Sequence, residues 1–325
     1  MTTTRTNIRS RRGTRAWPLA LIAVAAVGCG TSTPSSASTP DRTVGSSAPL
    51  PTGAPISSQS IGASAEPAAA SPNLVLVAIG DSIPYNLQED CPGCTGFVDA
   101  YGAALEAEVG QRVDVLNRSR HDGAQTFDIL VQLESDEDLL AELASADVIV
   151  TSIGFNDQPP FIDAYDGCPE PVTDSDSIQI LAERAAATSR ECIDSAVLVL
   201  RRQVAEVFAI VREQAPGAGI GALTPYDTWL GWSGLDSVDP PARNDLHDVV
   251  GYWMHEYREA MCAEAEAIGA VCVDVYSAFN GPEGTQPPTD FVAGDYTHPS
   301  QEGNDVIREL LVEADLADGG DSGQR

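Results

Sequence analysis

The sequence predicts an α/β fold, a three-layer α/β/α sandwich with a central parallel sheet of about five strands. Two observations lead to this prediction. Five short apolar segments, several rich in β-branched residues, are spaced along the chain, as is typical of strands buried on both faces. Helical patterns separate these segments, and helical crossovers are the usual connections between parallel strands. Hydrophobic residues make up 43% of the 325 residues, which is enough to form a core.

The predicted elements alternate within residues 73–318, which we expect to form one domain. Strands are expected at residues 74–79, 113–116, 148–153, 219–223 and 271–275. Helices are expected at residues 96–109, 124–144 (as one helix or two), 190–214, 243–268 and 299–316. In such sheets, ligand sites form at the carboxyl ends of the strands. The residues that follow each predicted strand are therefore the first place to look for chemistry.

The first 72 residues have the composition of a targeting segment followed by a linker. Arginines precede an apolar run at residues 17–27, which is too short to span a bilayer comfortably and is typical of a signal peptide. Small residues before Cys29 resemble a bacterial lipobox, so residues 1–28 are predicted to be removed and Cys29 to be lipidated. Secretion with a different cleavage site is the alternative. Residues 29–72, rich in Ser, Thr, Pro and Ala, predict a disordered linker, and residues 319–325 a disordered tail.

The charge of the chain excludes several kinds of partner. Lys and Arg together number 18 against 48 Asp and Glu, which gives a formal net charge of −30. Binding to nucleic acid requires a basic surface, so no nucleic-acid partner is expected. The same acidity argues against docking on anionic lipid through charge. We expect an exported monomer, either held on the outer side of the membrane by its N-terminal lipid anchor alone or secreted.

Six cysteines follow Cys29, and an even number in an exported chain predicts disulfides. Six cysteines allow 15 pairings. Sequence order suggests the pairs Cys91–Cys94, Cys168–Cys192 and Cys262–Cys272. The first pair could instead be a redox or metal pair, although no thioredoxin-like context and no second CxxC accompany it. No cluster of His, Asp or Glu has metal-ligand spacing, so no metal or cofactor is expected.

Polar residues that could carry chemistry follow the predicted strands. Gly80-Asp81-Ser82 follows the first strand, Gly123 lies after the second, and Gly154-Phe155-Asn156-Asp157 follows the third. Asp295-Tyr296-Thr297-His298-Pro299 precedes the last helix. Each segment taken alone could be structural, since a serine can cap a helix and an asparagine can occupy a turn. Their common location at one edge of the sheet predicts a single site.

This pattern resembles the SGNH (GDSL-type) hydrolases, a family named after Ser, Gly, Asn and His in four sequence blocks. The resemblance extends over residues 74–316 and implies a flavodoxin-like fold and hydrolysis of esters. Ile83 stands where Leu is commonest, and a lone glycine such as Gly123 has little specificity. The G-x-S-x-G elbow of the α/β-hydrolases is absent, which argues against that version of the chemistry.

The chemistry of ester cleavage predicts a role for each residue. Ser82 is the predicted nucleophile, His298 the base that accepts its proton, and Asp295 the carboxylate that orients the histidine. The backbone N–H groups of Ser82 and Gly123 and the side chain of Asn156 are the predicted oxyanion-hole donors. Gly123 is expected to be a glycine because close approach of a substrate leaves no room for a Cβ.

The sequence thus predicts a serine esterase or lipase that acts through an acyl-enzyme. Its expected substrate is a small-molecule, lipid or acylated-glycan ester. Acyl transfer to envelope sugars and a non-catalytic envelope-binding module are the alternatives. His121 either lines the pocket or is an exposed loop residue, and residues 226–232 either form a pocket wall or pack internally. His247 and His255 are expected on the solvent face of the helix at 243–268.

Overall fold

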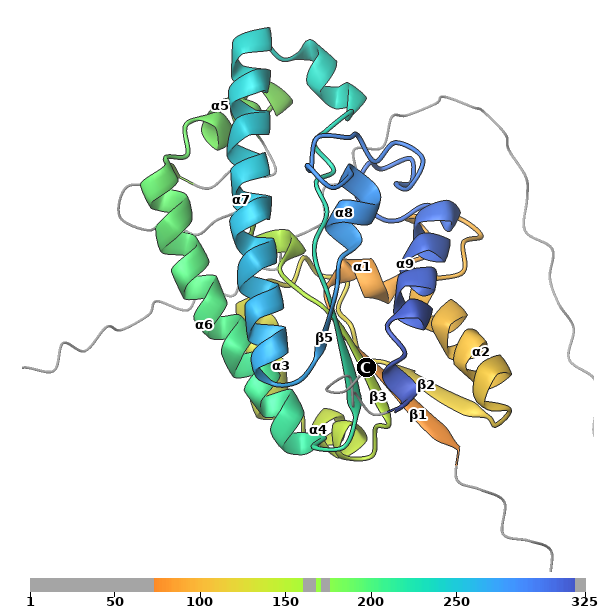
Figure 1. The fold of residues 1–325 in the computed structure, drawn as a ribbon. Coiled ribbons are helices and arrows are strands. Elements are labelled where there is room, and N and C mark those ends of the chain that lie inside the picture. Colours follow the sequence, from red (N-terminus) through yellow and green to blue (C-terminus); the bar gives the residue numbers. More distant parts are fainter. Residues whose placement is uncertain (1–72, 160–167, 171–175, 319–325) are drawn as a thin grey trace, which may run out of the picture. The chain divides into compact units, whose positions relative to one another are not determined.

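The computed structural model describes residues 73–159, 168–170 and 176–318. The predicted signal peptide, Cys29, the linker and the C-terminal tail lie outside these residues. The first element of the described part is a strand, β1 (Leu74–Gly80; Figure 1).

Five parallel strands form the central sheet, as the sequence predicts. They are β1 (Leu74–Gly80), β2 (Val113–Asn117), β3 (Val148–Ser152), β4 (Gly219–Leu223) and β5 (Val271–Val273). Their order in the sheet is β2-β1-β3-β4-β5. The chain moves from β1 to β2 on one side and then to β3 on the other, so the direction of winding reverses at β1. The carboxyl ends of β1 and β3 therefore flank the position where sites form in open α/β sheets.

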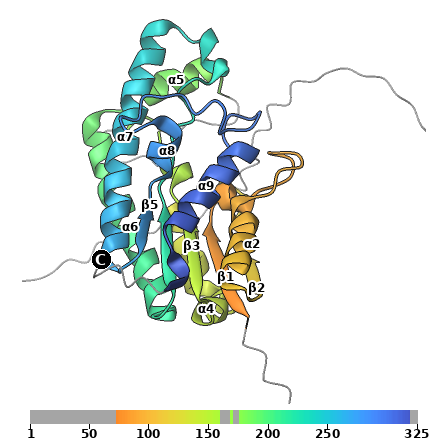
Figure 2. The ribbon, with the colours of Figure 1, turned by 45° about the vertical axis from the view of Figure 1, so that its right-hand side comes forward.

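Helices cover both faces of the sheet and complete the predicted three layers (Figures 1 and 2). One face carries α2 (Phe97–Val109) and α9 (Gln301–Glu313), which pack against each other. The other face carries α3 (Thr126–Ser135), α4 (Glu137–Ala144), α6 (Arg190–Gln214) and α7 (Pro240–Ala267). Alternate residues of β1 supply the two cores, with Val77 and Ile79 on the α6 side and Leu76 and Ala78 on the α2 side.

The region 124–144, where the sequence predicts one helix or two, contains two helices because Asp136 ends α3 and caps α4, its Oδ1 accepting from Leu139 N at 3.0 Å. The structure also defines elements that the sequence pattern does not predict. Two further helices are α5 (Ile178–Ala186), which packs against α7, and α8 (Val275–Asn280), which packs against α9. Short helical turns are found at α1 (Ser82–Tyr85), η1 (Phe155–Asp157), η2 (Ser233–Ser237) and η3 (Leu316–Asp318).

Three disulfides join cysteines of the described residues. The pairs are Cys91–Cys94, Cys168–Cys192 and Cys262–Cys272. The second attaches the segment 168–170 to the start of α6, and the third attaches α7 to β5. Within the residues described, no helix is both long enough and apolar enough to cross a membrane.

Candidate active site

The turn that follows β1 places Ser82 at the edge of the sheet. Asp81 caps the short helix α1, with Oδ1 accepting from Ile83 N at 3.0 Å, and its Oδ2 accepts from Phe155 N at 3.3 Å. One buried carboxyl group thus ties the end of β1 to the turn after β3. Gly80 permits this arrangement, because a Cβ there would lie 2.1 Å from the Ser152 carbonyl oxygen. Ser82, the first residue of α1, is buried within this frame.

The environment of Asp81 alters its protonation. Burial raises the pKa of its carboxyl group to about 7, against the lowering effects of its two backbone hydrogen bonds and of the charge on His298. The ring of His121 lies 5.3 Å from that of Tyr85 in α1 and 6.1 Å from that of His298, so the loop before α9 lies near the serine turn. Segments far apart in the sequence therefore meet here.

His298 and Asp295 form a hydrogen-bonded pair in the loop before α9. Nδ1 of His298 lies 2.6 Å from Asp295 Oδ2, and Oδ1 of the same carboxylate accepts from the backbone N–H groups of Thr297 and His298. The phenol of Tyr226, which follows β4, donates to the Thr297 carbonyl oxygen at 2.8 Å. These bonds fix both the loop and the imidazole. An Nδ1–H that donates to Asp295 leaves the lone pair on Nε2.

The charges around His298 raise its pKa above the ordinary value. Burial alone lowers the pKa, but the hydrogen bond and charge of Asp295, with the charges of Asp90 and Asp81, outweigh it. Burial also acts to raise the pKa of Asp295, yet the bond to His298 holds that pKa below its usual value. Among the described residues, Nε2 of His298 has no hydrogen-bond partner. Its lone pair is therefore free to accept a proton.

The three expected oxyanion donors come from neighbouring segments. Asn156 lies in η1, and its amide donates one hydrogen to the Ala124 carbonyl oxygen at 2.9 Å. Because an amide has two hydrogens, a second remains for a ligand. Gly123 has a φ of +70°, but a Cβ there would meet nothing within 4 Å. The positive φ alone favours glycine at this position, and the open space beside it is compatible with the close approach of a substrate that the sequence predicts.

The structure resolves the alternatives that the sequence leaves open. His121 lies in the site, with its ring 6.1 Å from that of His298 and its Nε2 2.9 Å from Asp90 Oδ2. Asp90 comes from the loop between α1 and α2, and no sequence motif indicates that it belongs to the site. Tyr226 and Trp229 are buried, so the loop after β4 packs internally. His255 is exposed as expected, whereas His247 is half-buried.

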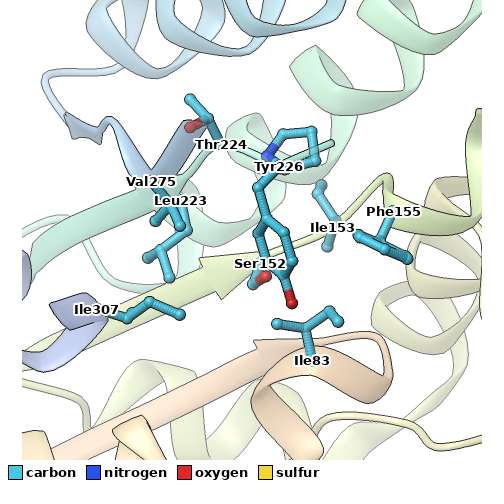
Figure 3. A pocket seen from close by; sticks show the side chains of 10 residues that line it. Ile83, Ser152, Ile153, Phe155, Leu223, Thr224, Tyr226, Val275 and Ile307 are labelled. Carbon is cyan, nitrogen blue, oxygen red and sulfur yellow. The ribbon is translucent and has the colours of Figure 1, made fainter. Parts of the chain in front are cut away.

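A small cavity lies beneath the site and is too small for a substrate. Apolar side chains such as Ile83, Phe155 and Ile307 line it, and Tyr226 extends into its centre (Figure 3). Its volume is about 10 Å³, roughly what one water molecule needs. Neither Ser82 nor His298 lines it. The cavity belongs to the packing that supports the site.

Comparisons with known proteins found a matching family model and similar solved structures. The model of the GDSL-like Lipase/Acylhydrolase family matches residues 78–306. The crystal structure of the lipase Lip_vut3 from a goat rumen metagenome is similar with a TM-score of 0.55 at 18% identity, covering 75% of this chain and 98% of that one. The lipase/acylhydrolase of Enterococcus faecalis has a TM-score of 0.46 at 18% identity, covering 74% of this chain and 94% of that one. None of the curated proteins compared with the chain matches it.

The family match identifies an enzyme that hydrolyses ester bonds. The chain belongs to the GDSL-like lipase/acylhydrolase family, whose model covers most of the described residues.

Proposed function

We propose that the enzyme cleaves carboxylic esters through a covalent acyl-enzyme on Ser82, with His298 as base and Asp295 as the carboxylate that orients it. The observation that carries this proposal is the Asp295–His298 pair. Its 2.6 Å hydrogen bond fixes the imidazole in a buried position while Nε2 remains without a partner among the described residues. A serine hydroxyl needs such a base, because it is a weak nucleophile until its proton is removed.

In this mechanism the Ser82 oxygen attacks the ester carbonyl carbon while Nε2 of His298 takes the hydroxyl proton. The carbonyl oxygen becomes an oxyanion, for which the Ser82 and Gly123 backbone N–H groups and the Asn156 amide are the proposed donors. One such donor is typically worth about 3–4 kcal/mol. The protonated His298 then gives its proton to the leaving alcohol. Water, activated by the same histidine, releases the acid from Ser82.

We propose a small-molecule, lipid or acylated-glycan ester as the substrate. The test is hydrolysis of p-nitrophenyl esters with acyl chains from C2 to C16 by the wild type and by Ser82→Ala. The proposal expects turnover of at least one ester by the wild type and loss of that turnover in the variant. An acceptor sugar added to the same assay separates hydrolysis from acyl transfer, since only transfer yields an acylated sugar. Ser82→Ala that retains full turnover contradicts the mechanism.

We further propose that the enzyme is exported as a monomer and anchored by lipid at Cys29. The three disulfides support export, because disulfides persist in oxidising compartments. Wild-type protein should enter the detergent phase on partitioning, and Cys29→Ser should remain in the aqueous phase. Wild-type protein found only in the culture fluid, with an unmodified N-terminus, contradicts the anchor.

A further inference from the structure

Three potential metal ligands converge from three separate segments of the chain. Asp90 comes from the loop between α1 and α2, His121 from the loop between β2 and α3, and His298 from the loop before α9. Asp90 Oδ2 lies 2.9 Å from His121 Nε2 and 3.5 Å from His298 Nε2. All three atoms lie within 4.8 Å of one another. Their spacing in the sequence, across more than half of the chain, explains why no sequence pattern indicates this cluster.

The separations of these atoms suit a small four-coordinate ion. Zinc binds imidazole nitrogen at about 2.0–2.1 Å and carboxylate oxygen at about 2.0–2.2 Å in a tetrahedron. Ligand atoms around such an ion are therefore about 3.3–3.5 Å apart. The two distances to Asp90 Oδ2, 2.9 and 3.5 Å, are close to this value, and the two imidazole nitrogens lie within 4.8 Å of each other, so side-chain shifts would complete the geometry. Three protein ligands leave a fourth position for water.

A second observation also points to a ligand in this position. Nε2 of His298 has no hydrogen-bond partner among the described residues, although the side chain is only 7% exposed. Its Nδ1 donates to Asp295, an arrangement that in metal sites fixes the ring and makes Nε2 the ligand atom. A buried nitrogen with an available lone pair thus lies beside a carboxylate and a second imidazole.

The surrounding structure holds Asp90 in place. The Cys91–Cys94 disulfide closes the turn that follows Asp90. Thr95 N donates to Gln301 Oε1 at 2.8 Å, which attaches the loop to α9 next to the His298 loop. The carboxylate is therefore positioned before any ion binds.

We propose that Asp90, His121 and His298 form a binding site for zinc or a similar divalent transition metal, and that the bound metal inhibits the enzyme. Two imidazole nitrogens and one carboxylate oxygen favour zinc over magnesium or calcium, which prefer oxygen ligands alone. Both histidines bind as neutral imidazoles through Nε2, with the proton on Nδ1. The metal then occupies the lone pair that accepts the Ser82 proton. The inhibitory part of this inference rests on the proposed function of His298.

The first test measures binding without reference to activity. Isothermal titration of zinc into the full chain carrying Ser82→Ala should show a site that is lost when His121→Gln is added. His255→Gln, on the exposed face of α7, is the matched control and should bind zinc like the parent. Magnesium should not occupy the site. The inference is overturned if the parent binds no zinc. It is also overturned if His121→Gln binds zinc as tightly as the parent, because the zinc is then held at a different site. Asp90→Asn provides a second variant if His121→Gln is misfolded by circular dichroism.

The second test measures inhibition. The wild type, freed of metal by EDTA and dialysis, should lose ester hydrolysis as zinc is added and recover it with EDTA. In His121→Gln the apparent inhibition constant should rise at least about tenfold, each protein being compared with its own metal-free rate. If zinc binds at the site and the enzyme still hydrolyses ester at its metal-free rate, the inhibitory role is overturned. If the protein binds zinc as expected but hydrolyses no ester, the proposed function is contradicted and the metal site is still supported.

Discussion

At the residue scale, the proposed mechanism has the Asp295 carboxylate act on the reaction through His298, to which it is hydrogen-bonded. One oxygen accepts from Nδ1, and the other accepts from two backbone N–H groups of its own loop. The carboxylate therefore fixes both the position of the ring and the nitrogen that carries the proton. The three-residue spacing predicts the contact between the two side chains, because a carboxylate that close in sequence can reach the imidazole.

Asp295→Asn should lower kcat strongly while leaving the fold intact. The amide oxygen can still accept from the backbone, but its NH₂ group can donate to Nδ1 and force the proton onto Nε2. The same loss of tautomer control costs about 10⁴-fold in kcat in a serine protease, so a fall of about 10²-fold or more is expected here. Steady-state kinetics on one short-chain ester measure it. Asp290→Asn, an exposed change in the same loop, is the control, and an Asp295→Asn enzyme with full kcat would show that the triad is wrongly assigned.

A second buried carboxyl group, Asp227, makes stability depend on pH. Burial raises its pKa to about 7, although backbone hydrogen bonds from Trp229 and Leu230 lower it. In the unfolded chain an aspartate titrates near ~3.9. The folded state therefore favours the protonated form, and this group reduces stability progressively as pH rises from about 4 to about 7, with no further loss above that.

Asp227→Asn should remove this dependence, because the amide resembles the protonated acid and does not titrate. The difference in unfolding free energy between the variant and the wild type should shift in favour of the variant by about 1–4 kcal/mol as the pH rises from about 5 to about 8. Urea unfolding at the two pH values measures the change. Asp81 titrates in both proteins, so its contribution cancels. A stability difference that is the same at both pH values would refute the prediction.

At the element scale, the turn between β3 and η1 positions Asn156. Gly154 has a φ of +94°, and a Cβ there would lie 1.8 Å from the Tyr257 hydroxyl oxygen. That hydroxyl donates to the Ile153 carbonyl oxygen at 2.7 Å, so it cannot move away without losing a buried bond. Only glycine fits this turn, both in conformation and in space.

Gly154→Ala should therefore reduce both stability and activity. We expect a loss of about 1–3 kcal/mol in unfolding free energy and a fall in kcat/KM from displacement of Asn156. Gly110→Ala is a matched control, because Gly110 has a φ of +68° at the end of α2 and a Cβ there would meet nothing within 4 Å. The control should lose stability and keep kcat/KM. Equal kinetic effects in the two variants would contradict this account of the turn.

Periodicity predicts the long elements well and the short ones poorly. The five strands and the helices α2, α6, α7 and α9 lie close to their predicted bounds because each has a clear apolar face or run. The helix α8 has six residues, too few to show a helical period. Tertiary contacts with α9 stabilise it instead, and a sequence pattern does not contain those contacts.

At the scale of the whole molecule, the fold brings together residues that the sequence keeps apart. Ser82, Asn156 and His298 could be predicted because each stands beside a recognisable strand or helix. Asp90 could not be predicted as part of the site, and His121 only as one of two alternatives. Both lie in loops, and their meeting with His298 depends on how α9 packs beside α2.

The disulfides also act at this scale, because they join distant segments. Cys168 and Cys192 are 24 residues apart, and closing a loop of this size should stabilise the fold by about 3 kcal/mol. The double variant Cys168→Ser/Cys192→Ser should unfold at a lower temperature than the wild type. Cys262→Ser/Cys272→Ser, with a separation of 10 residues, should lose less. Differential scanning calorimetry ranks the two, and an unchanged Tm in the first variant would contradict the prediction.

The central claim, that Ser82 is the nucleophile, has a direct test. A fluorophosphonate forms a covalent bond with an activated serine, and mass spectrometry of the digested protein locates it. The account predicts one label, on the peptide that contains Ser82, with loss of both label and ester hydrolysis in Ser82→Ala. A label on a different serine, together with full hydrolysis by Ser82→Ala, would contradict it.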